Sequence, residues 1–164
     1  YQITWRSRKG FIYDLKTFTL ESTFNYNSEG WGITTAGDHL IMSDGSNKLY
    51  HIAPSTFNIL KEVEVYDHNG PVDQLNELEY VDGMIWANVW LTDRIVVIDP
   101  ETGIVRGELN LPGLLPAADK ARLDDKDDVL NGIVWNAGKG TFYVTGKRWP
   151  KLFEIKVKLI PYGR

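Results

Sequence analysis

The stretch "MIWANVWLTDRIVVID", residues 84–99, decides the fold, because two apolar runs flank one short polar turn. Its turn residues suit a chain reversal, and the runs suit paired strands. The same outline, with Gly, Asp, Asn or Pro in the turn, occurs in three further segments: "ITWRSRKGFIYD" (3–14), "LIMSDGSNKLYHIA" (40–53) and "TFYVTGKRWPKLFEIK" (141–156). We therefore predict four β-hairpins.

Each hairpin belongs to a larger repeated unit. A turn that leads to an outer strand follows three of the hairpins, with the sequences "DLKT" (14–17), "APST" (53–56) and "DPET" (99–102). Another strand lies between successive hairpins, in the segments "WGITT" (31–35), "NELEY" (76–80) and "NGIVW" (131–135). The unit therefore holds four short strands, of which this last one is the innermost.

Four antiparallel strands repeating every 40–50 residues or so are typical of β-propeller blades. A two-sheet sandwich would account for the strands but not for the repeat. The sequence holds about three and a half such blades, so we predict a partial β-propeller domain over 1–158 and a C-terminal tail over 159–164. One insertion of helical composition, residues 115–128, lengthens the interval between the second and third innermost strands. Because natural proteins avoid open sheet edges, we expect the chain to be a fragment lacking an upstream segment.

Composition excludes several classes of function. The net charge of −4, without any basic stripe, argues against a nucleic-acid partner. The chain has no cysteine, which excludes disulfides, thiol catalysis and cysteine-bound zinc. No apolar run is long enough to span a membrane. The three histidines lack metal-ligand spacing, and no phosphate-binding or dinucleotide motif is present, so we predict neither metal nor cofactor.

Equivalent positions of successive propeller blades converge on one point near the axis. Trp31, Asn76 and Asn131 occupy such positions at the innermost strands, and the hairpin turns add Trp5, Trp90 and Lys147. An aromatic box with two amides and one lysine suits a small molecule or a peptide end. Each residue also has a purely structural alternative: the tryptophans as packing between blades, the asparagines as partners of a backbone turn, the lysine as a surface charge.

Glu77 and Glu79 lie on the same face of one innermost strand, since side chains alternate along a strand. Paired carboxylates can perform acid–base chemistry. They can equally form ion pairs with Lys or Arg of a neighbouring blade, and we favour this structural role.

Six ordered motifs resemble one family, the plant and bacterial (metal-independent) glutaminyl cyclotransferases. They are "GWGITT" (30–35), "IMSDGS" (41–46), "VDQLNELEY" (72–80), "WANVWLTDRI" (86–95), "DVLNGI" (128–133) and "FYVTGKRWPKLFEIK" (142–156). The resemblance implies a five-bladed propeller that converts the N-terminal glutamine of peptides or proteins to pyroglutamate and releases ammonia. It also implies a periplasmic or secreted location and no metal or cofactor.

The resemblance further implies residue roles. Trp5, Trp31 and Trp90 match the aromatic walls of the substrate pocket, and Asn76 and Lys147 match its polar, catalytic residues. Asn131 matches a family motif, and its place in the substrate-binding set follows from the repeat.

The chain departs from the family pattern at one important point. The family's presumed acid–base glutamate lies in a "GEGLT"-like motif upstream of Trp5, and neither that motif nor an "FTQGL"-like segment occurs here. We therefore expect the 164-residue chain alone to be inactive, with the missing N-terminal segment as its natural complement. The alternative is a non-catalytic propeller module that binds peptide ends.

Overall fold

The computed structural model describes residues 1–123 and 126–158, and the predicted tail over 159–164 lies outside them. Two sheets have four strands each: β3 (Gly32–Ala36), β4 (His39–Ser43), β5 (Lys48–Ile52) and β6 (Ile59–Glu64), then β9 (Leu75–Val81), β10 (Met84–Val89), β11 (Arg94–Ile98) and β12 (Val105–Asn110). A three-stranded sheet follows, with β13 (Leu130–Asn136), β14 (Thr141–Gly146) and β15 (Phe153–Ile155). Two smaller sheets pair β1 (Lys9–Tyr13) with β2 (Leu20–Asn25), and β7 (Tyr66–Asp67) with β8 (Gly70–Pro71).

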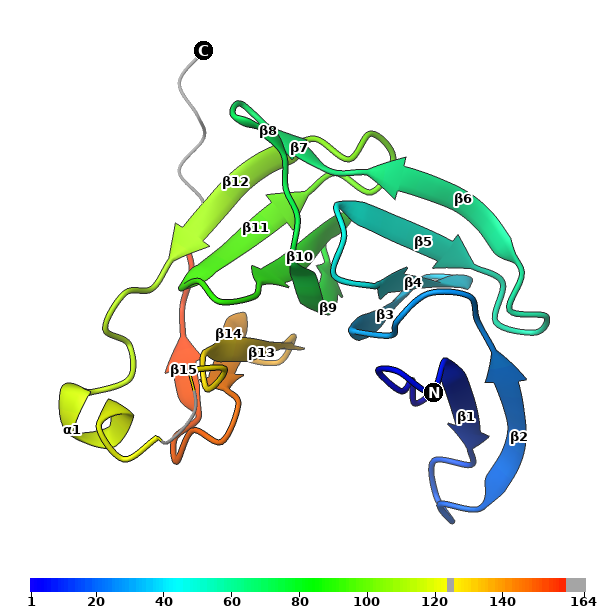
Figure 1. Cartoon of the computed structure of the whole chain (residues 1–164), viewed down its shortest axis with the longest axis horizontal. Helices are drawn as coiled ribbons and strands as arrows, with labels where there is room; N and C mark the ends of the chain where they lie inside the picture. The colour runs from blue at the N-terminus through cyan, green and yellow to red at the C-terminus, as the bar shows by residue number, and fades with distance from the viewer. Residues whose placement is uncertain (124–125, 159–164) are drawn as a thin grey trace.

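The sheets follow one another around an arc in chain order (Figure 1). Their inner strands β3, β9 and β13 lie toward the centre of the arc, and β6 and β12 lie at its outer rim (Figure 1). Every strand pair within these sheets is antiparallel. The prediction of an all-β propeller built from four-stranded blades is therefore confirmed.

Three of the four predicted hairpins form, as β4–β5, β10–β11 and β14–β15. The prediction for residues 3–14 is wrong in its first half, where only an isolated bridge joins Gln2 to Phe11. Residues 5–7 form a bend and Arg8 has a positive φ of 53°, so this charged segment cannot continue as a strand. The second half forms β1, which pairs with β2, the outer strand predicted after the turn at 14–17.

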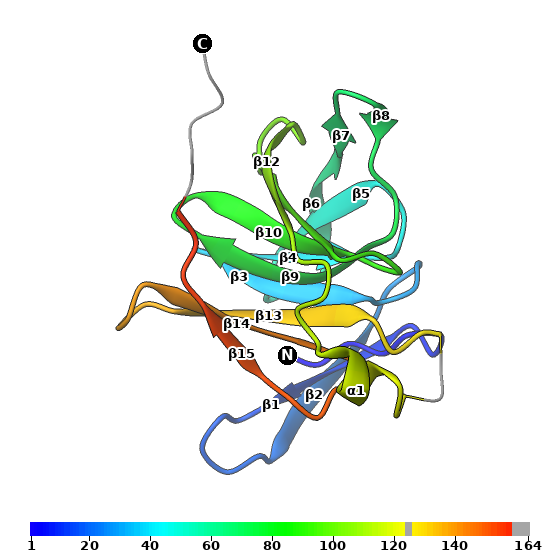
Figure 2. The same cartoon turned by 90° about the vertical axis from the view of Figure 1, so that its left-hand side faces the viewer.

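Within the described residues of the 115–128 insertion, Ala117–Lys120 form the short helix α1, which lies next to β15 (Figure 2). Across the described residues, no helix is long and apolar enough to cross a membrane.

The core lies between the sheets and explains the apolar runs. β10 and β11 are covered on both faces, so successive side chains point into different clusters. Ile85 and Val96 pack toward the β3–β6 sheet, whereas Trp86 and Val97 pack toward β13–β15. A strand buried on both faces needs apolar residues at every position rather than at alternate ones. This requirement accounts for the "RIVVI" sequence of β11.

The inner strands approach one another very closely where the predicted site residues begin. Gly32 opens β3, and a Cβ atom there would lie only 2.0 Å from the backbone oxygen of Asn76 on β9. The hydroxyl of Ser43 donates a hydrogen bond of 2.7 Å to the same oxygen. The glycine therefore lets two blades meet, and the serine fixes the start of β9 at the junction.

Candidate functional site

A cavity of about 360 Å³ lies where the inner strands begin. It is lined by Trp5, Gly30, Trp31, Asn76, Glu77, Trp90, Asp127, Asn131 and Lys147. All six residues singled out from the sequence are among them. The structure thus brings together residues from four separate sheets and their connecting loops, as the blade repeat predicts. Their chemical roles stay predictions.

Three tryptophans form the aromatic part of the cavity. Trp31 and Trp90 meet edge to face, with ring centroids 5.2 Å apart and planes at 87°. The Trp31 backbone N–H donates to the carbonyl of Ser43 (3.0 Å), which holds the residue against β4. Trp5 is 52% exposed, and the Arg6 guanidinium lies 3.9 Å from the centroid of its ring. The walls therefore differ in how firmly packing holds them, and Trp5 is the loosest.

Asn76 is a buried polar residue whose side-chain amide is free to bind a ligand. Only 5% of the residue is exposed. Its backbone oxygen is occupied by Ser43, and its amide side chain has no hydrogen bond within residues 1–123 and 126–158. Its amide lines the cavity, where a ligand can form hydrogen bonds with it.

Asn131 is partly engaged by the fold. Its side-chain oxygen accepts a long hydrogen bond of 3.4 Å from the backbone N–H of Glu77, joining β13 to β9. This contact supports the structural alternative for the oxygen, while the amide NH₂ group remains available to the cavity.

Lys147 presents its ammonium group at the aromatic corner. The Nζ atom lies 5.4 Å from the centroid of the Trp90 ring, within the range of a cation–π interaction. Within the described part of the chain this ammonium has no ion pair. Its positive charge is therefore available to an anion that develops in the cavity.

The roles expected for Glu77 and Glu79 need correction. Neither carboxylate forms the predicted ion pair with Lys or Arg, as far as the described residues show. Glu79 accepts a hydrogen bond of 2.9 Å from the backbone N–H of Trp135, and burial raises its pKa. Glu77 faces the cavity, and burial raises its pKa too, partly offset by the charge of Lys147.

The expected ion pairs of Glu77 and Glu79 do not form because of the way β13 packs against β9. It covers both carboxylates and supplies a backbone donor, not a basic side chain, to Glu79. The sequence did carry one usable signal, since Glu77 adjoins Asn76 at the converging start of an inner strand.

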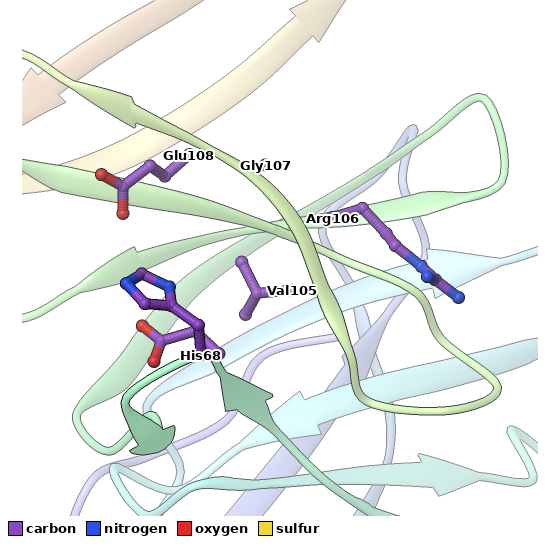
Figure 3. A pocket seen from close by; sticks show the side chains of 6 residues that line it. His68, Val105, Arg106, Gly107 and Glu108 are labelled. Carbon is purple, nitrogen blue, oxygen red and sulfur yellow. The ribbon is translucent and has the colours of Figure 1, made fainter. Parts of the chain in front are cut away.

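A larger hollow of about 560 Å³ lies outside this site, between the β7–β8 hairpin and β12. Figure 3 shows His68 and Glu108 on one side of Val105 and Arg106 pointing away from them. The charged groups there are already paired: Arg94 with Asp67 (3.3 Å) and Glu108 (2.8 Å), and Arg106 with Asp99 (3.0 Å). None of the predicted site residues lines this hollow.

No group of three or more His, Asp or Glu residues within the described ranges is arranged to hold a metal ion. His39 and His51 stack on each other instead, with facing ring nitrogens 2.9 Å apart. The lining of the cavity is thus aromatic, amide, carboxylate and ammonium, a set that can orient an amide substrate and stabilise charge.

Comparison with known proteins agrees with this geometry. The chain matches the family model described as glutamine cyclotransferase over residues 1–157. It is 39% identical to a glutaminyl-peptide cyclotransferase of Arabidopsis thaliana over 163 residues, which cover 96% of this chain and 49% of the relative.

A solved structure is similar as well. The crystal structure of Myxococcus xanthus glutaminyl cyclase superposes with a TM-score of 0.86 at 36% identity, covering 93% of this chain and 65% of that one. The chain therefore spans about half the length of the curated relative and about two thirds of the solved one. By sequence and by fold, the chain belongs to the glutamine cyclotransferase family.

Proposed function

We propose that the complete gene product converts the N-terminal glutamine of peptides or proteins to pyroglutamate and releases ammonia. The observation that carries the proposal is the convergence of three tryptophans, two asparagines and a lysine on one cavity. Membership of the family supports it, and so does the similarity to a glutaminyl-peptide cyclotransferase and to a glutaminyl cyclase.

The reaction is an intramolecular acyl transfer. The α-amino nitrogen attacks the side-chain amide carbon, a new C–N bond closes the five-membered ring, and the old C–N bond breaks. One proton leaves the attacking nitrogen and one reaches the departing nitrogen, which leaves as ammonia. Because both reacting groups belong to one molecule, holding the glutamine in a folded pose supplies much of the rate. Trp5, Trp31 and Trp90 provide the walls for that pose.

Negative charge develops on the amide oxygen during the attack. Asn76 can donate hydrogen bonds from its buried side-chain NH₂ group, and Lys147 can supply a positive charge. Donors that are already fixed around the developing oxyanion stabilise the transition state more than the substrate. We assign this role to Asn76 and Lys147.

Proton transfer requires a group such as a carboxylate. The α-amino group of a peptide carries a proton near neutral pH and must lose it before it attacks. The family resemblance assigns this step to an upstream glutamate. Glu77 is a second candidate, because it lines the cavity and its raised pKa suits proton exchange.

The test measures ammonia release from a peptide that begins with glutamine, using the complete gene product. Asn76→Ala and Lys147→Ala are expected to lower kcat by about a hundredfold, because each removes a group that stabilises the oxyanion. Lys16→Ala, in an exposed turn, is the matched control and should leave kcat unchanged. A protein that binds the peptide yet releases no ammonia would instead be a peptide-end-binding module.

A further inference from the structure

Glu29 joins two walls of the cavity. It lies in the connection between β2 and β3, and its Oε2 atom accepts hydrogen bonds from two indole N–H groups. The distance is 2.5 Å to Nε1 of Trp5 and 2.9 Å to Nε1 of Trp31. An indole has only this one donor, so a single carboxylate oxygen satisfies the full hydrogen-bonding capacity of both tryptophans.

The two tryptophans reach Glu29 from different parts of the fold. Trp5 belongs to the irregular segment before β1, and Trp31 immediately precedes β3 of the next sheet. Their backbones are linked by a hydrogen bond of 3.2 Å from the N–H of Gly30 to the carbonyl of Trp5, and beside it the Tyr26 hydroxyl accepts a hydrogen bond of 2.7 Å from the N–H of Thr4. No strand pairing therefore fixes one wall relative to the other. Those contacts hold the backbone, whereas Glu29 is the side chain that bonds to both indole rings and sets the separation of the rings themselves.

Trp5 depends on this link more than Trp31 does. Half of Trp5 is exposed, so burial holds its ring weakly. Trp31 also rests against Gly45, where a Cβ atom would lie 2.6 Å from the indole ring. Without Glu29 the Trp5 ring could leave the cavity, whereas Trp31 would keep its backing.

The carboxylate is well suited to remain ionised. The indole N–H of Trp31 and then that of Trp5 lower its pKa, with smaller contributions from the charges of Arg6 and Arg8. Hydrogen bonds to an ionised acceptor are stronger than those to a neutral one. Arg6 and Arg8 thus help to keep Glu29 ionised, which strengthens its hydrogen bonds to the two indoles.

We propose that Glu29 is a positioning residue, which fixes Trp5 and Trp31 at the separation that receives the substrate's glutamine side chain. The inference rests on the proposed function for its substrate. Glu29 does not line the cavity itself and acts through the two indoles. Because the aromatic walls contact the substrate before and during reaction, their loss should weaken binding throughout and raise KM more than it lowers kcat.

The experiment compares Glu29→Ala and Glu29→Gln with the unmodified complete gene product. Glu29→Ala is expected to raise KM for a glutamine-initiated peptide about tenfold with kcat within about threefold, as the loss of charge-assisted hydrogen bonds predicts. Glu29→Gln keeps an acceptor oxygen and should restore most of the KM. Glu21→Ala on exposed β2 is the matched control for the lost charge.

Near-ultraviolet circular dichroism provides a readout that does not depend on turnover. The tryptophan signal should change in Glu29→Ala and return in Glu29→Gln. A merely structural role would lower the folded fraction, which reduces the maximal rate and leaves KM as it was. An unchanged KM with an unchanged tryptophan signal would overturn the proposal. Absence of ammonia release by the unmodified protein would overturn the proposed function instead, and the spectroscopic comparison would still test Glu29.

Discussion

The Trp31 and Trp90 rings meet edge to face across two blades, 5.2 Å apart at 87°, and Lys147 lies over the second ring. This geometry places the positive edge of one aromatic ring against the negative face of the other. It also brings the ammonium to the aromatic face that favours a cation. The corner of the cavity is therefore held by contacts between side chains from three different sheets.

Replacing Trp90 should open this corner. Trp90→Leu is expected to raise KM for a glutamine-initiated peptide about tenfold and also to lower kcat, because Lys147 loses the ring that orients it. Trp90→Phe keeps an aromatic face, so its KM and kcat should lie between those of Trp90→Leu and those of the unmodified protein. Steady-state ammonia release measures both constants, with Leu152→Ala, an exposed residue, as control. Unaltered kinetics in Trp90→Leu would remove Trp90 from the substrate pocket.

Closing the gap between the inner strands should destabilise the fold. In Gly32→Ala, the added methyl group would meet the backbone oxygen of Asn76, which cannot rotate away. The strands must separate, at a cost of about 1–3 kcal/mol in the free energy of unfolding. Urea denaturation measures this loss. Gly107→Ala on β12, where the new methyl group meets nothing within 4 Å, should cost far less.

The sequence was most informative where the innermost strands of the blades repeat one another. The repeat alone groups Trp31, Asn76 and Asn131, because equivalent positions of neighbouring blades converge near the axis. The strands of β10 and β11 followed from their apolar runs for a related reason, since inner blades are covered on both faces. Local pattern and global fold agree at these positions.

The sequence was least informative where a contact joins segments that no repeat relates. The repeat itself was wrong at one place, because the positive φ at Arg8 interrupts the strand expected at the start of 3–14. Glu29 bonds to an indole 24 positions away, through a link that only the folded loops create. The environment of Glu77 depends on the packing of β13 against β9.

Asn131 should contribute to stability as well as to the cavity. Asn131→Ala removes the acceptor of the Glu77 backbone N–H and is expected to cost about 1 kcal/mol of unfolding free energy. Asn131→Asp retains an acceptor oxygen but lacks the NH₂ group. It should therefore be more stable than the alanine variant, and any activity that it loses relative to the unmodified protein reports the NH₂ group. Thermal unfolding and ammonia release are measured on the same samples. Equal stability of Asn131→Ala and the unmodified protein would show that the 3.4 Å contact carries no energy.

The raised pKa of Glu77 predicts that this carboxylate destabilises the protein at neutral pH. Burial holds its pKa in the folded state above the value of 4.5 that applies to an unfolded chain. Below pH 4.5 the group is protonated in both states. As pH rises from there through the folded-state pKa, the unfolded chain ionises first and stability falls. Glu77→Gln stays neutral, so its Tm at pH 7 should exceed that of the unmodified protein by a few degrees and converge with it toward pH 4.

A carboxylate that lowers stability in this way is expected to be kept for function. Glu77→Gln should therefore lose activity while it gains Tm, and the acid limb of its kcat/KM profile should flatten if Glu77 exchanges the substrate proton. Glu79→Gln is the matched control, because glutamine can still accept the Trp135 N–H and Glu79 does not line the cavity. It should gain stability and keep its pH profile. Full activity with an intact acid limb in Glu77→Gln would place proton exchange on another carboxylate.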